Sequence, residues 1–144
     1  MATISGGGDV LEVTRLPQIH VFEVAMSLTD DGATGTIDVP LCTLPKGTRI
    51  TDVVVEVMTA EAGATSAALD IEVGAIDLLD CGADSLGTVN RKSASVPGGT
   101  YNGIGANTAL SGAASALNCE VTIVGTATTA PVFYIFLTAY RPYF

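Results

Sequence analysis

Three aspartates that lie close together in the sequence are the first candidates for chemistry. Asp77, Asp80 and Asp84 fall within the segment AIDLLDCGADSLG. Carboxylate oxygens are the ligands that a hard cation such as calcium prefers, but this spacing does not match an EF-hand loop. The leading interpretation is a solvated acidic loop, with metal binding as the weaker alternative.

His20 is the only histidine, so every Ser-His-Asp or Cys-His mechanism would have to pass through it. In an extended strand it shares one face with Phe22, Val24 and Met26. This pattern predicts an imidazole in a core or an interface, satisfied by hydrogen bonds, rather than a catalytic base. No GxSxG motif surrounds any serine.

The three cysteines, Cys42, Cys81 and Cys119, lie far apart and match no close-spaced metal pattern. Together with His20 they would supply four zinc ligands, but no close pair nucleates such a site. Buried, reduced thiols are the simpler prediction. The glycine clusters SGGGD, PGGT and GIGA lack the lysine of a phosphate-binding loop. We therefore expect no catalytic residue, no cofactor-binding residue and no cofactor.

The composition limits the partners that the chain can have. Fifteen acidic and six basic residues give a net charge of -9, which disfavours direct binding to nucleic acid. Only 15% of the residues are charged and 48% are hydrophobic, so part of the surface is expected to be covered by partners. The apolar stretch at 131–140 is too short to span a bilayer as a helix, and the first residues do not resemble a secretory signal.

The periodicity of the sequence predicts an all-β protein. Segments with strand character lie at 10–16, 18–29, 36–44, 48–59, 67–74, 118–128 and 130–144, with turns at 29–35 and 60–66. Residues 75–117 are expected to be mainly irregular, with either one short helical turn or one short strand at 76–87. The glycine-rich residues 1–9 are expected to form a flexible N-terminal arm. About eight strands without an amphipathic helix indicate an antiparallel β-sandwich in a single domain, residues 10–144, and favour a jelly roll.

The alternation of side chains predicts which faces are buried in two of these strands. In 48–59, the alternation places Thr51, Val53, Val55, Val57 and Thr59 toward the core and mixes acidic with apolar side chains on the other face. The segment 130–144 is apolar on both faces, which predicts either a central strand or a strand at a subunit interface. Its interface candidates are Val132, Tyr134, Phe136 and Tyr140.

The segment GTRITDVVVEVMTAEAGATSAALDIEVGAIDLLDCGADSL resembles small virion proteins of tailed bacteriophages, in particular head decoration or cement proteins. The resemblance rests on the pattern IxDVxVxV, a turn with Ala and Gly, a strand that ends in VG and an acidic loop. Glycine- and alanine-rich sequence and an aromatic C-terminal strand follow. It implies a β-sandwich or jelly-roll homotrimer, made in the host cytoplasm, that sits on the virion capsid surface and braces subunits of the major capsid protein.

Two other functions remain open from the sequence. The residues at 75–117 could form loops of a receptor-binding or fibre-tip domain of a phage tail. A small jelly-roll hydrolase is the third possibility, and it would depend on His20 alone. The leading expectation is a structural virion protein without enzymatic activity.

Overall fold

The computed structural model describes residues 3–5, 10–27, 35–45, 47–73, 76–95 and 115–141. The described residues form nine strands, of which the first five are β1 (Thr3–Ser5), β2 (Gln18–Ala25), β3 (Gly35–Leu44), β4 (Arg49–Thr59) and β5 (Ala62–Val73). They are followed by β6 (Ile76–Asp80), β7 (Arg91–Ser95), β8 (Ser115–Thr129) and β9 (Val132–Tyr140). The described residues contain no helix.

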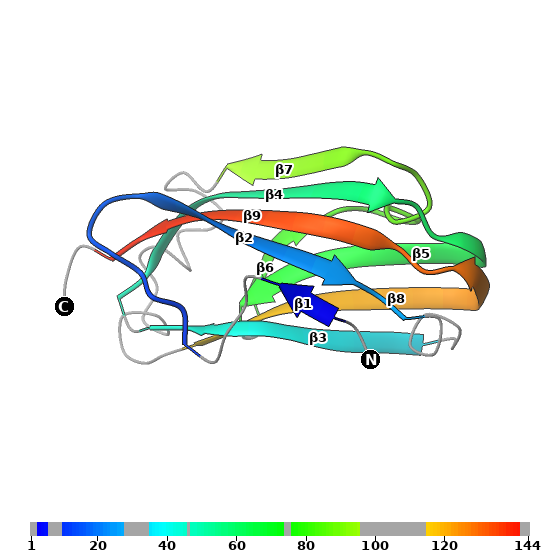
Figure 1. Cartoon of the computed structure of the whole chain (residues 1–144), viewed down its shortest axis with the longest axis horizontal. Coiled ribbons are helices and arrows are strands. Elements are labelled where there is room, and N and C mark those ends of the chain that lie inside the picture. Colours follow the sequence, from blue (N-terminus) through cyan, green and yellow to red (C-terminus); the bar gives the residue numbers. More distant parts are fainter. Residues whose placement is uncertain are drawn as a thin grey trace.

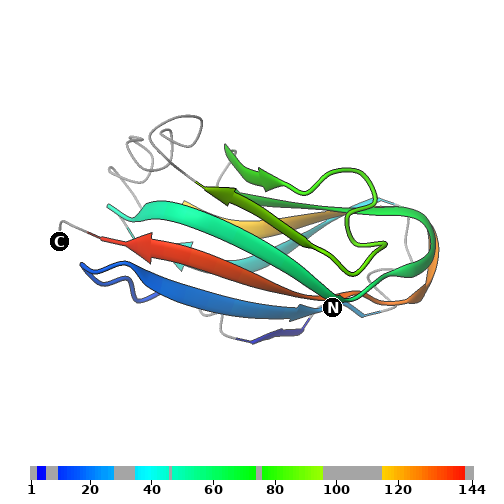
Figure 2. The same ribbon diagram turned by 90° about the horizontal axis from the view of Figure 1, so that it is seen from above.

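The nine strands form two sheets that face each other. Sheet A has the order β1-β2-β9-β4-β7, and sheet B has the order β3-β8-β5-β6. Figures 1 and 2 show the sheets as two layers, with β2, β9, β4 and β7 side by side in one of them. Every neighbouring pair is antiparallel, so the predicted antiparallel β-sandwich is confirmed.

The eight strands from β2 through β9 pair with one another in a nested order, as the two arms of one long hairpin would. β2 pairs with β9, β3 with β8, β4 with β7, and β5 with β6. Two further ladders, between β4 and β9 and between β5 and β8, join these pairs into the two sheets. The chain therefore changes sheets as it runs from β2 to β3, from β3 to β4 and from β4 to β5.

The core lies between the sheets and follows the two-residue period of the strands. In β9, Phe133, Ile135, Leu137 and Ala139 are fully buried, whereas the residues between them are half-buried. In β8, Leu117, Cys119, Val121 and Ile123 are fully buried in the same way. β9 lies between β2 and β4, so the prediction of a central strand at 130–144 is confirmed for Val132–Tyr140.

The strand at 48–59 differs from its predicted alternation at its beginning. The pairing with β9 shifts register between Ile50 and Asp52, so Thr51 is an extra residue. Such a β-bulge reverses the facing of the residues before it. Ile50 is therefore buried and Thr51 is not, whereas Val53, Val55 and Val57 face the core as predicted. Thr59, also predicted toward the core, is exposed because the register shifts again between Val57 and Thr59.

Residues 10–16 do not form the predicted strand. Val10 makes an isolated bridge to Thr43, and the amide of Leu11 donates to the carbonyl of Thr43. Farther on, the amide of Arg141 donates to the carbonyl of Thr14. The segment thus crosses from β3 in one sheet to the end of β9 in the other without pairing in a ladder. Val13 is buried in the core and Leu11 packs against it, whereas Val10 and Leu16 are exposed.

Three other boundaries differ from the sequence prediction. The expected turn at 60–66 is shorter, because β5 begins at Ala62. The region 75–117 contains β6 and β7, although residues 96–114 lie outside the described part. Thr3–Ser5 of the predicted arm pair with β2 as β1, whereas the predicted turn at 29–35 lies outside the described residues except for Gly35.

Candidate functional site

The outward side of sheet B carries a group of carboxylates that we call the acidic face. It consists of Asp38, Asp70, Glu72, Asp77, Asp80 and Glu120. Asp38, Glu120, Asp70 and Asp80 lie directly opposite one another across β3, β8, β5 and β6, which makes one row of like charges. The sequences of these four strands contain no lysine, arginine or histidine, so this row has no basic residue within its own sheet.

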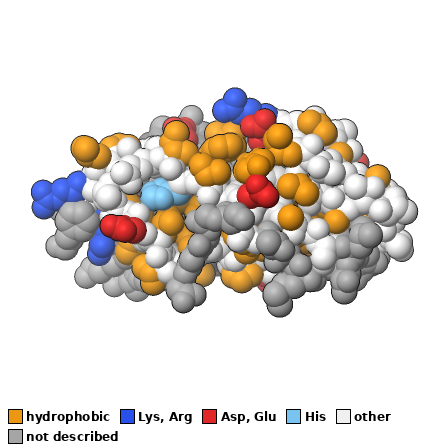
Figure 3. Space-filling view, in the orientation of Figure 1, with side chains coloured by type: hydrophobic (Ala, Val, Ile, Leu, Met, Phe, Trp, Pro, Cys, Tyr) orange, Lys and Arg blue, Asp and Glu red, His pale blue; other side chains and the backbone are white. Residues whose placement is uncertain are grey.

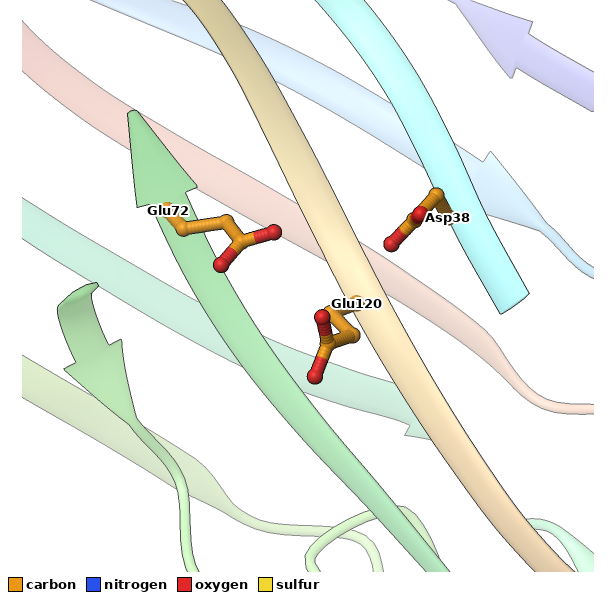
Figure 4. A group of neighbouring side chains, drawn as sticks. All are labelled: Asp38, Glu72 and Glu120. Carbon is orange, nitrogen blue, oxygen red and sulfur yellow. The ribbon is translucent and has the colours of Figure 1, made fainter. Parts of the chain in front are cut away.

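Three of these carboxylates converge on one point. Asp38, Glu72 and Glu120 place ligand oxygens within 4.8 Å of one another. Figure 4 shows that they come from three adjacent strands and that their carboxylates lie on the same side of the sheet. An oxygen cluster of this kind has the chemistry of a site for a hard cation, but exposed acidic groups also occur without one.

Proton binding is the chemistry that the acidic face favours most directly. Burial, a hydrogen bond to Asp80 and the charges of Asp80, Asp77 and Glu120 raise the pKa of Asp70 to about 6. Burial and the charges of Glu120, Asp38 and Asp77 also raise the pKa of Glu72. Both shifts have the sign expected when carboxylates are held together without a counter-charge.

The predicted candidates Asp77, Asp80 and Asp84 do not form this converging group. Asp80 Oδ1 accepts a hydrogen bond from the amide of Gly82, and Asp84 Oδ1 accepts one from the amide of Ala67. Asp84 therefore holds the loop after β6 against β5, and only Asp77 and Asp80 belong to the acidic face. The structure places the cluster on residues that the sequence analysis did not select.

Sheet A has an outward side of a different kind, which we call the apolar face. The predicted interface candidates Val132, Tyr134, Phe136 and Tyr140 all lie on it and are half-buried within the single chain. Ile19 and Val21 of β2 and Val54 of β4 extend it, because they are in register with Thr138 and Phe136 of β9. Figure 3 shows hydrophobic side chains gathered over β2, β9 and β4, with acidic side chains among them.

Two β-branched side chains of this face are exposed in the single chain. Ile19 is 65% exposed and Val21 is 43% exposed. The rings of Tyr134 and Phe136 lie 6.1 Å apart between their centroids, and a hydrogen bond to Glu23 raises the pKa of Tyr134. An aromatic pair with a polar end beside exposed β-branched residues is a composition typical of protein interfaces.

His20 lies where the alternation predicts, in register with Leu137 on the inner side of sheet A. Burial lowers its pKa, and its buried Nε2 atom has no hydrogen-bond partner among the described residues. The expectation of a hydrogen-bonded imidazole is therefore not met at Nε2. The imidazole lies on the inner side of the sheet and is only partly buried, and the loss of solvent around it is what lowers its pKa.

Cys42, Cys81 and Cys119 are free and buried, as predicted. Burial raises the pKa of Cys42 to about 12 and that of Cys119 well above its ordinary value. Since the thiolate is the nucleophile and the metal ligand, these thiols are held in their unreactive form. Their role in the structure is to fill the core.

Comparison with known proteins finds no matching family model, no matching curated protein and no matching solved structure. A search of the described residues for membrane spans finds no helix long and apolar enough to cross a bilayer. The two faces are therefore the features from which a function has to be argued.

Proposed function

We propose that this chain is a structural virion protein that decorates the outer surface of a phage capsid as a homotrimer and braces subunits of the major capsid protein. The apolar face is the observation that carries the proposal. It leaves β-branched side chains exposed and aromatic side chains only half-buried on a sheet whose other side already makes the core. The proposal assigns no catalytic residue and no cofactor to the chain.

The nested strand pairing supports a fold suited to such a role. We infer that β2 to β9 form a jelly roll, in which a long hairpin is folded over into two four-stranded sheets. The sheets β2-β9-β4-β7 and β3-β8-β5-β6 fit this arrangement, and β1 is added at the edge of β2. Jelly rolls recur in viral capsid domains, which agrees with the resemblance of residues 47–87 to head decoration proteins.

The chemistry of the two faces suggests how the protein would sit on a capsid. Burial of the apolar face would contribute about 25 cal/mol for each Å² of apolar surface removed from water. The acidic face, on the opposite side of the sandwich, repels copies of itself and stays hydrated. In this arrangement the apolar face contacts capsid subunits or neighbouring copies, and the acidic face points outward.

The test uses heads of the phage that encodes the chain, made with this gene deleted. We expect the purified protein to bind these heads to saturation and to raise the temperature at which they release DNA. The variant Phe136→Glu is expected to bind much less, whereas Val124→Glu on the outward side of sheet B serves as the matched control.

Three results would contradict the proposal. One is the absence of binding to heads, and another is equal binding by both variants. The third is protein found only at the tail of complete virions, which would favour the receptor-binding alternative.

A further inference from the structure

The apolar face of sheet A has an aromatic ring with a carboxylate on each side of it. Tyr134 of β9 is in register with Glu23 of β2 on one side and with Glu56 of β4 on the other. Side chains directly opposite one another in neighbouring antiparallel strands have Cβ atoms about 5 Å apart. The ring therefore stands between two acidic side chains, and Figure 3 shows acidic side chains among the hydrophobic ones of this face.

The next row of the same face is apolar. Phe136 follows Tyr134 by two residues in β9, and it is in register with Val21 of β2 and Val54 of β4. The two rings lie 6.1 Å apart between their centroids, with 31° between their planes. Both rings are half-buried, and Val21 is 43% exposed. A row of acid, ring and acid thus lies beside a row of valine, ring and valine.

The two carboxylates differ in their partners within the chain. Glu23 accepts a hydrogen bond from the hydroxyl of Tyr134, which anchors the ring. Glu56 is in register with Arg91 of β7 on its other side, but it makes no hydrogen bond or ion pair within the described part of the chain. The row holds two acidic residues and one basic residue, so it keeps a net negative charge. Glu56 is therefore a half-buried acceptor beside a ring, ready to accept from another molecule.

This combination suits the guanidinium group of an arginine. A cation over the face of a tyrosine or phenylalanine ring is attracted by the negative charge of the π-system. Guanidinium is planar, so it can stack on a ring while it donates hydrogen bonds in its own plane to carboxylates, whereas a lysine ammonium is a point charge without a plane. The aliphatic part of the arginine would lie on Phe136 and its valine neighbours, because such stems cover apolar surface.

We propose that the aromatic pair and the two carboxylates beside it, which we call the arginine site, bind an arginine side chain of the protein that covers the apolar face. The inference rests on the proposed function, because it takes that protein to be the capsid, and it adds what the capsid surface must present there. Arginine is enriched together with tyrosine and phenylalanine in protein interfaces. The net charge of -9 also favours a partner with a basic surface.

A small probe tests the arginine site on the purified full-length protein. N-acetyl-arginine amide carries the guanidinium as its only charge, and N-acetyl-citrulline amide has nearly the same shape without the charge. We expect the arginine probe at millimolar concentrations to shift the NMR signals of the Tyr134 and Phe136 rings saturably, and the citrulline probe to shift them far less. Equal shifts with the two probes, or no shift with either, would overturn the proposal.

Three variants assign the binding to these residues. Glu56→Gln keeps the size of the side chain and removes its charge, so it should weaken binding of the arginine probe about tenfold. Asp52→Asn is the matched control, because Asp52 lies on the same side of β4 but opposite Thr138 instead of a ring, and it should change binding by less than about twofold. Tyr134→Leu keeps an apolar side chain without a π-face and should lose the preference for arginine over citrulline. Equal losses from Glu56→Gln and Asp52→Asn would show general attraction of cations and contradict a site.

Binding to heads that lack the protein separates the inference from the proposed function. Glu56→Gln should bind these heads about tenfold more weakly than Asp52→Asn. A protein that binds the arginine probe but no heads would retain the arginine site and reject capsid decoration. Equal binding of both variants to heads would retain decoration and reject the arginine site as a contact with the capsid.

Light scattering distinguishes a capsid arginine from an arginine of a second copy. We expect Glu56→Gln and Arg91→Gln to leave the solution mass of the purified protein unchanged. A lower mass for both variants, with unchanged binding to heads, would place the arginine on a neighbouring copy of this chain and overturn its assignment to the capsid.

Discussion

Asp70 and Asp80 face each other across β5 and β6, with no basic residue in their sheet to separate their charges. Like charges placed directly opposite in a sheet are destabilising. This cost favours the protonated form of Asp70, and its pKa is accordingly raised. The proton is retained more strongly in the folded chain than in the unfolded chain, so the stability of the protein is linked to pH.

The sign of this linkage gives a prediction for Asp70. Its pKa is about 6 in the folded chain against an ordinary value of 3.8. The stability that Asp70 gains by holding a proton in the folded chain is therefore fully present below about pH 4 and is lost as the pH rises through 6. Asp70→Asn should remove this loss and raise the free energy of unfolding near pH 8 by about 1 kcal/mol, a value reduced for screening by solvent. Urea denaturation at a series of pH values measures it.

Asp52→Asn is the matched control for Asp70, because Asp52 lies on the outward side of sheet A opposite Thr138 and Ser95. It should leave the pH dependence between 4 and 7 unchanged. Equal pH profiles for the wild type and Asp70→Asn would show that the proton is held elsewhere.

At this scale the sequence analysis did not select the carboxylates that converge, and the reason is physical. Asp77, Asp80 and Asp84 are close in the chain, and proximity in sequence is the only distance that a sequence offers. Asp38, Glu72 and Glu120 come together because β3, β8 and β5 are neighbours, and that order depends on long-range pairing. The facing of Tyr134 and Phe136 could be predicted, since it follows from the two-residue period within one strand.

The loop after β6 acts as an extension of that strand along the edge of β5. Cys81 donates from its amide to the carbonyl of Leu69, and Leu86 donates to that of Ala67. In return, the amide of Ala67 is bound by the carboxylate of Asp84 at 3.0 Å, and the amide of Leu69 by the hydroxyl of Ser85 at 2.9 Å. The edge of sheet B is thereby covered where β6 ends.

Asp84 is the residue whose loss should open this edge. It adopts a φ of +53°, a region in which aspartate and asparagine are favoured over alanine, and Asp84→Ala would leave the buried amide of Ala67 without a partner. We expect a loss of about 2 kcal/mol in the free energy of unfolding. Asp84→Asn keeps an acceptor and should cost less than half as much. Chemical denaturation with Asp77→Ala as the exposed control checks this, and equal losses for all three variants would contradict it.

Whether a strand could be predicted from the sequence depends on how many consecutive residues carry its pattern. β4, β5, β8 and β9 were predicted because their β-branched and aromatic residues alternate over long stretches. β7 was missed, and β6 was left open between a short strand and a helical turn, since five residues give few repeats and Leu78 and Leu79 are both buried, against the alternation of a strand. The segment 10–16 was assigned wrongly because its valine and leucine content matches that of a strand, although only Val13 is buried and the segment forms no ladder.

The whole molecule is a sandwich with opposite properties on its two outer sides. The sheet with the apolar face has β9 at its centre, and the sheet with the acidic face has β8 and β5 at its centre. One core cluster joins them, with residues from both sheets. Because each side keeps its own chemistry, the sandwich can bind through one side while the other stays in water.

The uneven charge of the molecule predicts that salt stabilises it. With fifteen acidic and six basic residues, repulsion dominates at low ionic strength, and it is concentrated on the acidic face. Raising NaCl from about 0.01 M to about 0.15 M shortens the Debye length from about 30 Å to about 8 Å, and the melting temperature should rise. The variant Asp38→Asn/Glu72→Gln/Glu120→Gln should melt higher at low salt and gain less from added salt. The same gain in both proteins, measured by differential scanning calorimetry, would place the repulsion outside the acidic face.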